Sequence, residues 1–283
     1  MLAANLSCIS RTRVIARPGT RAAQPLLTAQ REELLERITK QYAAIGSLSL
    51  TVDMAPLLGS AAKGKITEYQ DVRGYLLYRA PSSLRLIGLY PVVRTKAFDM
   101  VTDGTLFRLY LPALNRFVEG PEVGGQPSAK KIENLRPLHF LEALNIKPVD
   151  PEAEKPVLHN LTDEKNAAYV LDLLAEKNSA LWLKRQIWFD RLTLRVTRQI
   201  LFDERGDILT DARYSAWRKE GAVEIPGQFE INRPKDEYGV VMKVTRLDLN
   251  PRLGDEKFAL DRPAGVQVRD VGVAPAGNKD MSK

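Results

Sequence analysis

AFDMVTDGTLFRLYLPALNRF, residues 97–117, is the stretch that decides the fold. Residues 98–102 and 105–110 consist largely of apolar and β-branched residues, and they flank Asp103-Gly104, a dipeptide favoured in tight hairpin turns. Residues 115–119 continue as a short strand before Gly120-Pro121 interrupts the pattern. The stretch therefore predicts successive antiparallel strands joined by short turns.

The same alternation with a period of two extends on both sides of this stretch. Within residues 47–53, Leu48, Leu50 and Val52 alternate with polar residues, so one face of a strand is expected to be apolar. Further candidate strands are residues 63–72, 74–78, 84–90, 167–175, 181–189, 192–202, 208–217, 228–232 and 240–249. The chain has no strand–helix–strand alternation and no long internal repeat. These strands predict an antiparallel meander that forms a strongly curved sheet or an open barrel.

Two segments show helical periodicity instead. The first carries one apolar stripe that ends at Gly46 and consists of Leu34, Ile38, Tyr42 and Ile45. The second runs from Ser128, a candidate cap, to Leu144, and Pro137 divides it into a helical hairpin. Residues 148–165 are rich in proline and acidic residues, which predicts a surface connection.

Composition excludes several classes of protein. Hydrophobic residues make up 44% and charged residues 27% of the 283 residues, which is ordinary for a globular chain. No apolar run approaches the roughly 18 residues that a membrane-spanning helix needs. One cysteine and two histidines exclude an internal disulfide framework and argue against a zinc or iron site. We therefore expect no metal and no other cofactor.

The net charge of +7 is concentrated near the N-terminus. Residues 1–31 contain five arginines and no acidic residue, which leaves only +2 for the rest of the chain. A nucleic-acid-binding protein carries its basic surface on the folded domain, so we expect no nucleic-acid partner. We expect residues 1–27 to form a disordered basic tail, which either contacts a phosphate-rich membrane surface or is simply solvated.

No catalytic constellation is recognisable. The chain contains no glycine-rich phosphate loop, no G-x-S-x-G elbow and no H-E-x-x-H motif. His139, beside Pro137 and between two apolar residues, is expected to be structural. The prominent carboxylates fall where hairpin turns are expected: Asp103, Asp190, Asp203 and Asp207. We therefore expect a binding scaffold without catalytic residues, and a hydrolase remains open only if two carboxylates converge in a pocket.

Residues 97–117 resemble the hairpin of the LolA family, in which a strand, an s-D-G turn, an aromatic residue and x-Y-x-P precede x-x-N-x. Residues 258–268, FALDRPAGVQV, are similar to that family's closing F-x-l-x-x-P-x-G-v-x-v. Asp203 to Gly206 fits its D-x-x-G meander, and the opening helix before Gly46-Ser47-Leu48 also matches in place. The resemblance spans about residues 30–269.

The LolA family comprises periplasmic lipoprotein carriers, and it includes LolB-like outer-membrane receptors and the sensor domain of RseB/MucB-type envelope-stress regulators. The resemblance implies an α+β, mainly antiparallel β fold. This fold is an open, strongly curved half-barrel sheet with an N-terminal helix and the inserted helical hairpin as a lid. We expect a single domain over residues 28–271, followed by a disordered C-terminal tail over residues 272–283.

The resemblance also implies an apolar concave cavity that shields the acyl chains of lipid or lipoprotein from water. Strand position and apolarity select the candidate lining residues Leu50, Val52, Leu76, Tyr78, Leu86, Phe98, Met100, Leu109, Trp188 and Phe189. The implied function is lipid or lipoprotein binding by a monomer in the cell envelope, in lipoprotein sorting or outer-membrane biogenesis. The alternative is an interaction or envelope-stress sensor module of the same fold without carrier activity, which a polar or collapsed concave face would favour.

Asn5-Leu6-Ser7-Cys8 resembles a lipobox, the motif in which a small residue precedes the cysteine to be acylated. The motif departs at Asn5, where leucine is usual, and seven residues before Cys8 are too few for the regions of a signal peptide. Either the true start lies upstream or Cys8 is incidental. We expect the first, which makes Cys8 the lipid anchor, residues 9–27 a leash, and the protein a periplasm-facing lipoprotein of the outer membrane.

Overall fold

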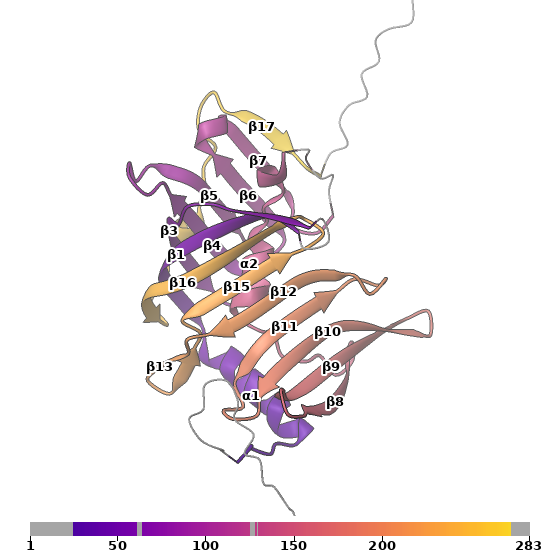
Figure 1. The fold of residues 1–283 in the computed structure, drawn as a ribbon. Helices are drawn as coiled ribbons and strands as arrows, with labels where there is room; N and C mark the ends of the chain where they lie inside the picture. The colour runs from indigo at the N-terminus through magenta and orange to yellow at the C-terminus, as the bar shows by residue number, and fades with distance from the viewer. Residues whose placement is uncertain (1–24, 61–63, 125–127, 129, 273–283) are drawn as a thin grey trace, which may run out of the picture.

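The computed structural model describes residues 25–60, 64–124, 128 and 130–272. Among these residues, fifteen strands form one open sheet in which β17 and β8 are the two edges (Figure 1). The strand order is β17-β7-β6-β5-β4-β3-β1-β16-β15-β12-β11-β10-β9-β8, with β2 paired to the far end of β1. All the pairs are antiparallel except β17–β7, which is parallel. The expectation of a mainly antiparallel, unclosed sheet is confirmed.

The strands of the first half are β1 Ser47–Ser60, β2 Lys65–Glu68, β3 Val72–Arg79, β4 Ser83–Leu89, β5 Lys96–Thr102, β6 Leu106–Leu111 and β7 Arg116–Pro121. The strands of the second half are β8 Lys155–Thr162, β9 Ala167–Lys177, β10 Ala180–Asp190, β11 Val196–Phe202, β12 Ile208–Ser215, β13 Arg218–Glu220, β14 Val223–Ile225, β15 Gln228–Arg233, β16 Tyr238–Leu249 and β17 Gln267–Asp270. The α-helices are α1 Arg31–Ala44 and α2 Pro137–Leu144. Short 3-10 turns cover Pro112–Leu114, Lys131–Asn134 and Asp255–Phe258.

The hairpin predicted at Asp103-Gly104 is present between β5 and β6. A carboxylate oxygen of Asp103 accepts hydrogen bonds from the amides of Thr105 and Leu106 at 2.8 and 2.9 Å. Gly104 has a φ of +95°, a backbone conformation that side chains with a Cβ rarely adopt. The local sequence therefore suffices to place this turn.

Three local expectations are corrected. Residues 148–165, expected to be a surface connection, contain the edge strand β8, because Pro156 is tolerated at an edge where no partner needs its missing amide hydrogen. The first half of the expected helical hairpin is only the 3-10 turn Lys131–Asn134, and Pro137 begins the one true helix, α2. The hairpin of β13 and β14 and the parallel strand β17 were not expected.

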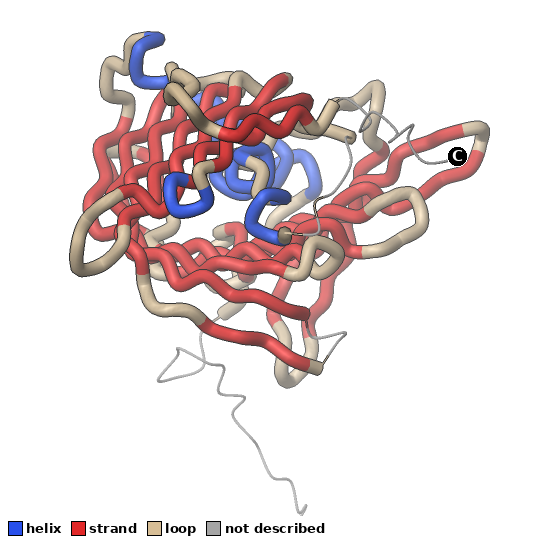
Figure 2. The backbone as a smooth tube through the Cα atoms, turned by 90° about the horizontal axis from the view of Figure 1, so that it is seen from above, coloured by secondary structure: helices blue, strands red, loops and turns tan. Residues whose placement is uncertain are grey.

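The helices lie within the curve of the sheet when it is viewed from above (Figure 2). Helix α1 packs Leu34 and Ile38 against the β9–β10 half of the sheet, in a cluster with Leu171, Ile187 and Phe189. Helix α2 is buried on nearly every side, and its apolar residues join the large cluster formed by β1, β3, β4, β5 and β16. The stripe expected on the first helix is therefore the surface that attaches it to the sheet.

The opposite face of the β3–β7 half is covered by the chain after β16. Arginines on the sheet donate to successive carbonyls of this chain: Arg79 to Leu253 at 2.9 Å, Arg85 to Ala259 at 2.9 Å and Arg108 to Leu260 at 3.4 Å. These bonds lead the chain across the strands to the point where β17 pairs with β7.

A buried ion pair fixes the connection from α2 to β8. The guanidinium of Arg185 on β10 donates to both carboxylate oxygens of Glu154, at 2.9 and 2.6 Å, and the two side chains are 8% and 3% exposed. The same guanidinium donates to the carbonyls of Lys147 and Pro148. Lys184 is a second cation, 3.2 Å from Glu154.

We predict that Arg185→Ala lowers the free energy of unfolding by about 3 kcal/mol, because it leaves a buried carboxylate with only Lys184 to compensate. Lys177→Ala is the matched control, since Lys177 pairs with Glu204 while both side chains are more than half exposed. Its loss should stay below about 1 kcal/mol. Denaturant unfolding measures both values, and equal losses would contradict a structural role for the buried pair.

Candidate functional site

The largest apolar cavity opens at one end of the half-barrel. It has a volume of about 620 Å³, within the range of roughly 300–1,000 Å³ that is typical of small-molecule sites. Its lining comes from the second half of β1, the starts of β5 and β16, the segments 111–114 and 131–135, and Phe140 of α2. We call this cavity the apolar cleft.

The mouth of the apolar cleft is itself apolar. Tyr69, Tyr90, Leu114 and Ile132 belong to the lining and remain 40–53% exposed to solvent. Among the described residues, Lys131 is the one charged side chain of the lining, and it pairs with Glu237. Such a surface gives up free energy when an apolar ligand covers it, because burial of apolar area is favourable.

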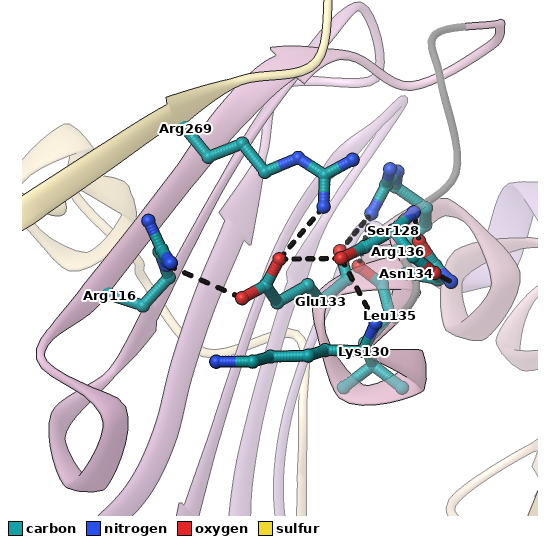
Figure 3. Close-up of polar contacts among 8 residues, drawn as sticks. All are labelled: Arg116, Ser128, Lys130, Glu133, Asn134, Leu135, Arg136 and Arg269. Atoms are coloured by element: carbon teal, nitrogen blue, oxygen red, sulfur yellow. Dashed lines mark hydrogen bonds and ion pairs between the residues drawn. The ribbon is translucent and has the colours of Figure 1, made fainter.

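One wall of the apolar cleft is held by a buried carboxylate (Figure 3). Glu133 is 3% exposed and lies 3.3 Å from Arg116 of β7 and 2.8 Å from Arg269 of β17. The hydroxyl of Ser128 donates to it at 2.7 Å. Burial opposes ionisation, but this hydroxyl and the two arginines outweigh it and lower the pKa of Glu133 below its ordinary value. The ionised carboxylate therefore anchors the wall segment to the edge of the sheet.

The α2 side of the apolar cleft contains a neutral histidine. The imidazole of His139 is 8% exposed and shares a hydrogen bond with the hydroxyl of Tyr238, a residue of the lining. Burial, with Arg233 and Arg136 nearby, lowers the pKa of His139 well below its ordinary value. This arrangement agrees with the structural role expected from the sequence.

Seven of the ten candidate lining residues lie together in the main core. Leu50, Val52, Leu76, Tyr78, Leu86, Met100 and Leu109 are each at most 2% exposed and pack in the same cluster as α2. The strand pattern thus selected the concave face, but α2 covers that face at these positions. Phe98 differs, because it is half-buried and lines the apolar cleft.

The remaining two candidates lie on opposite faces of β10. Phe189 is 1% exposed and lines a second cavity beneath α1. Trp188 is turned away from it, since adjacent residues of a strand alternate between faces, and its ring lies 5.6 Å from the guanidinium of Arg198. The expectation that both residues line one concave surface is corrected for Trp188.

Most residues of the apolar cleft were not among the candidates. Leu57 and Leu58 lie on the extension of β1 beyond the predicted strand, and Leu111, Ile132 and Leu135 lie in short segments outside or at the ends of strands. Clusters of apolar residues in non-strand segments were the available signal, but sequence alone does not place those segments beside one another.

The carboxylates singled out in the sequence serve turns. Asp190 accepts the amide of Leu192, and Asp203 accepts the amides of Arg205 and Asp207. Asp203 and Asp207 also converge on Lys235, and neither belongs to the lining of the apolar cleft. Among the described residues, no cluster of three or more potential metal-ligating side chains is present.

Cys8 and most of the basic tail lie outside the described residues, as do residues 273–283. None of the helices in the described part of the chain has the length and apolar character needed to cross a bilayer.

No protein-family model and no curated protein matches the sequence. Solved structures match the fold. A LolA-superfamily protein from Nitrosomonas europaea superposes with a TM-score of 0.53 at 15% identity, covering 82% of this chain and 99% of its own. A domain from Vibrio parahaemolyticus described as an outer-membrane lipoprotein-sorting protein gives 0.51 at 12% identity, covering 80% and 94%. A DUF1329-family protein from Desulfovibrio piger gives 0.54 at 16% identity, covering 80% and 94%.

These superpositions define the class of fold. The chain has a LolA-like fold, as the sequence resemblance implied, and at these identities the likeness concerns the fold alone.

We predict a pH dependence from Glu122, which follows β7 and is 5% exposed. Burial raises the pKa of Glu122 to about 7, against an ordinary value of 4.5, with Thr102 and Arg136 partly opposing it. Between these two values the unfolded chain has lost a proton that the folded chain retains, so the free energy of unfolding falls as the pH rises. The component amounts to up to about 3 kcal/mol.

Glu122→Gln should remove this component, so that the variant gains stability relative to the wild type between pH 5 and pH 8. Denaturant titrations at several pH values measure the difference. Parallel pH profiles for the two proteins would contradict the prediction.

Proposed function

We propose that this protein binds acyl chains of lipid or lipoprotein in the apolar cleft. The observation that carries the proposal is a solvent-open cavity of about 620 Å³ whose lining is almost wholly apolar and contains no carboxylate. Transfer of acyl methylenes from water into such a cavity stabilises by about 0.8 kcal/mol each, or roughly 13 kcal/mol for a chain of 16 carbons at full burial. An acylated cargo needs such shielding to leave a membrane.

We propose further that the protein works in the cell envelope, in lipoprotein sorting or outer-membrane biogenesis. The LolA-like fold supports this, because a protein described as lipoprotein-sorting shares it. In this proposal acylated Cys8 is the membrane anchor, and the arginines of the basic tail add electrostatic attraction to anionic headgroups. Binding without catalysis is part of the proposal.

A second candidate function is an interaction or sensor module that does not carry lipid. The observation that favours it is the burial of the concave face under α2, where seven candidate lining residues are at most 2% exposed. On this alternative, the exposed apolar mouth of the cleft would contact a protein.

We predict that protein purified from its own membranes, without added lipid, retains acyl-chain ligand that native mass spectrometry detects. Leu135→Glu should reduce retention and lower the affinity for an uncharged fatty alcohol more than tenfold, because a carboxylate in the apolar cleft must be desolvated on binding. Ala113→Trp, an exposed position of the lining, tests the same point by filling space.

Leu181→Glu is the matched control, since Leu181 is 56% exposed on β10 and lies outside the apolar cleft. It should leave binding unchanged. A protein that is consistently empty, and whose alcohol binding none of these substitutions alters, would favour the interaction module instead.

A further inference from the structure

A second cavity lies at the other end of α2. It has a volume of about 530 Å³ and shares no lining residue with the apolar cleft. Its lining comes from one face of α1, the turn into β11, the hairpin of β13 and β14, and the residues that follow α2. We call this cavity the basic pocket.

The floor of the basic pocket is apolar. Leu48, Phe189 and Ile225 are each 1% exposed, and Trp217 is half-buried beside them. This floor offers the same burial of apolar area as the apolar cleft.

The rim of the basic pocket differs from the apolar cleft in its charge. Its charged residues are Arg37, Lys40, Arg195, Lys219 and Glu224, four cations against one carboxylate. Three of the cations have acidic partners, while Lys219 forms no ion pair with a described residue. The C-terminal ends of α1 and α2 also reach the pocket, but each contributes only about half a negative charge. The balance of charge at the rim is therefore positive.

Contacts between α1, β11 and β14 hold the basic pocket in shape. The side-chain amide of Gln41 donates to the carbonyl of Glu224 at 2.6 Å, and Arg195 donates to the Glu224 carboxylate at 3.0 Å. The hairpin is thus attached to α1 and to β11, so the pocket exists before any ligand arrives.

The lining also contains a buried polar group that lacks a protein partner. Tyr214 is 6% exposed, and its hydroxyl makes no hydrogen bond within the described part of the chain. A buried hydroxyl without a partner is unfavourable, and such groups in native proteins usually bond to water or ligand.

We propose that the basic pocket binds a single-chain amphiphile with an anionic head group. The chain packs on the floor formed by Leu48, Phe189 and Trp217, and the head lies at the rim near Lys40 and Lys219. This goes beyond the proposed function, which concerns a different cavity and assigns no charge to the ligand.

Trp217 provides the reporter for the test. In a protein carrying Trp182→Phe and Trp188→Phe, titration with 9,10-dibromostearate should quench Trp217, because bromine quenches indole fluorescence on contact. The matched uncharged ligand, 9,10-dibromostearyl alcohol, should bind on the order of tenfold more weakly at pH 8, since each exposed charge pair contributes modestly. Equilibrium dialysis of labelled stearate against the unsubstituted protein repeats the comparison should the double variant fail to fold.

Lys40→Gln with Lys219→Gln should abolish the preference for the acid and leave the affinity for the alcohol unchanged. Lysophosphatidylglycerol, but not lysophosphatidylcholine, should compete if a phosphate head is accepted, and stearate competes if a carboxylate is. Equal affinity of Trp217-quenching acid and alcohol in the wild-type rim would overturn the inference.

Ala44→Phe, which fills the basic pocket, should abolish quenching of Trp217, whereas Leu135→Glu in the apolar cleft should not. The reverse pattern would assign the ligand to the apolar cleft and overturn this inference while leaving the proposed function standing. Loss of alcohol binding from the apolar cleft alone would contradict the proposed function and leave this inference intact.

Discussion

The apolar concave face of an open sheet must be kept from water, and the rest of the structure depends on how this is achieved. A closed barrel would cover the face with its own opposite wall, whereas here the sheet ends at β8 and β17. Two helices perform the task instead, α1 under one half and α2 under the other. Because α2 has eight residues and spans only about 12 Å, the face is left uncovered beyond both of its ends.

The two cavities follow from this geometry. The apolar cleft begins beyond the N-terminal half of α2, and the basic pocket begins at Leu144, where the helix ends. The segments that surround them are fastened by charged groups rather than by apolar packing: Glu133 holds one wall, Arg185 holds the connection after α2, and Arg195 holds the β14 hairpin. The apolar side chains at the openings are therefore free of a structural duty and available to a ligand.

Local sequence predicted the elements better than their contacts. Asp103-Gly104 placed a hairpin because turn chemistry is local, and the stripe containing Leu34 and Ile38 placed a helix because its period is local. Edge strand β8 was missed because its alternation is weak and includes Pro156. These differences concern the strength of a signal within a few residues.

The site was less predictable for a different reason. Leu50 and Phe98 are both apolar residues of strands, yet α2 covers the first and leaves the second beside the apolar cleft. That distinction depends on where a helix some forty residues further along the chain packs, which no periodicity records. The adjacent pair of Trp188 and Phe189 shows the smaller version of the problem, since a strand apolar on both faces does not reveal which face is concave.

The central claim is that the opening left beside α2 holds an acyl chain. The most direct measurement is anomalous diffraction from crystals of the protein grown with 9,10-dibromostearyl alcohol, an uncharged chain whose bromines can be located. The account predicts bromine peaks inside the apolar cleft, between Phe98, Leu111 and Leu135. Bromine found only on the outer surface of the protein, with the apolar cleft unoccupied at saturating ligand, would contradict it.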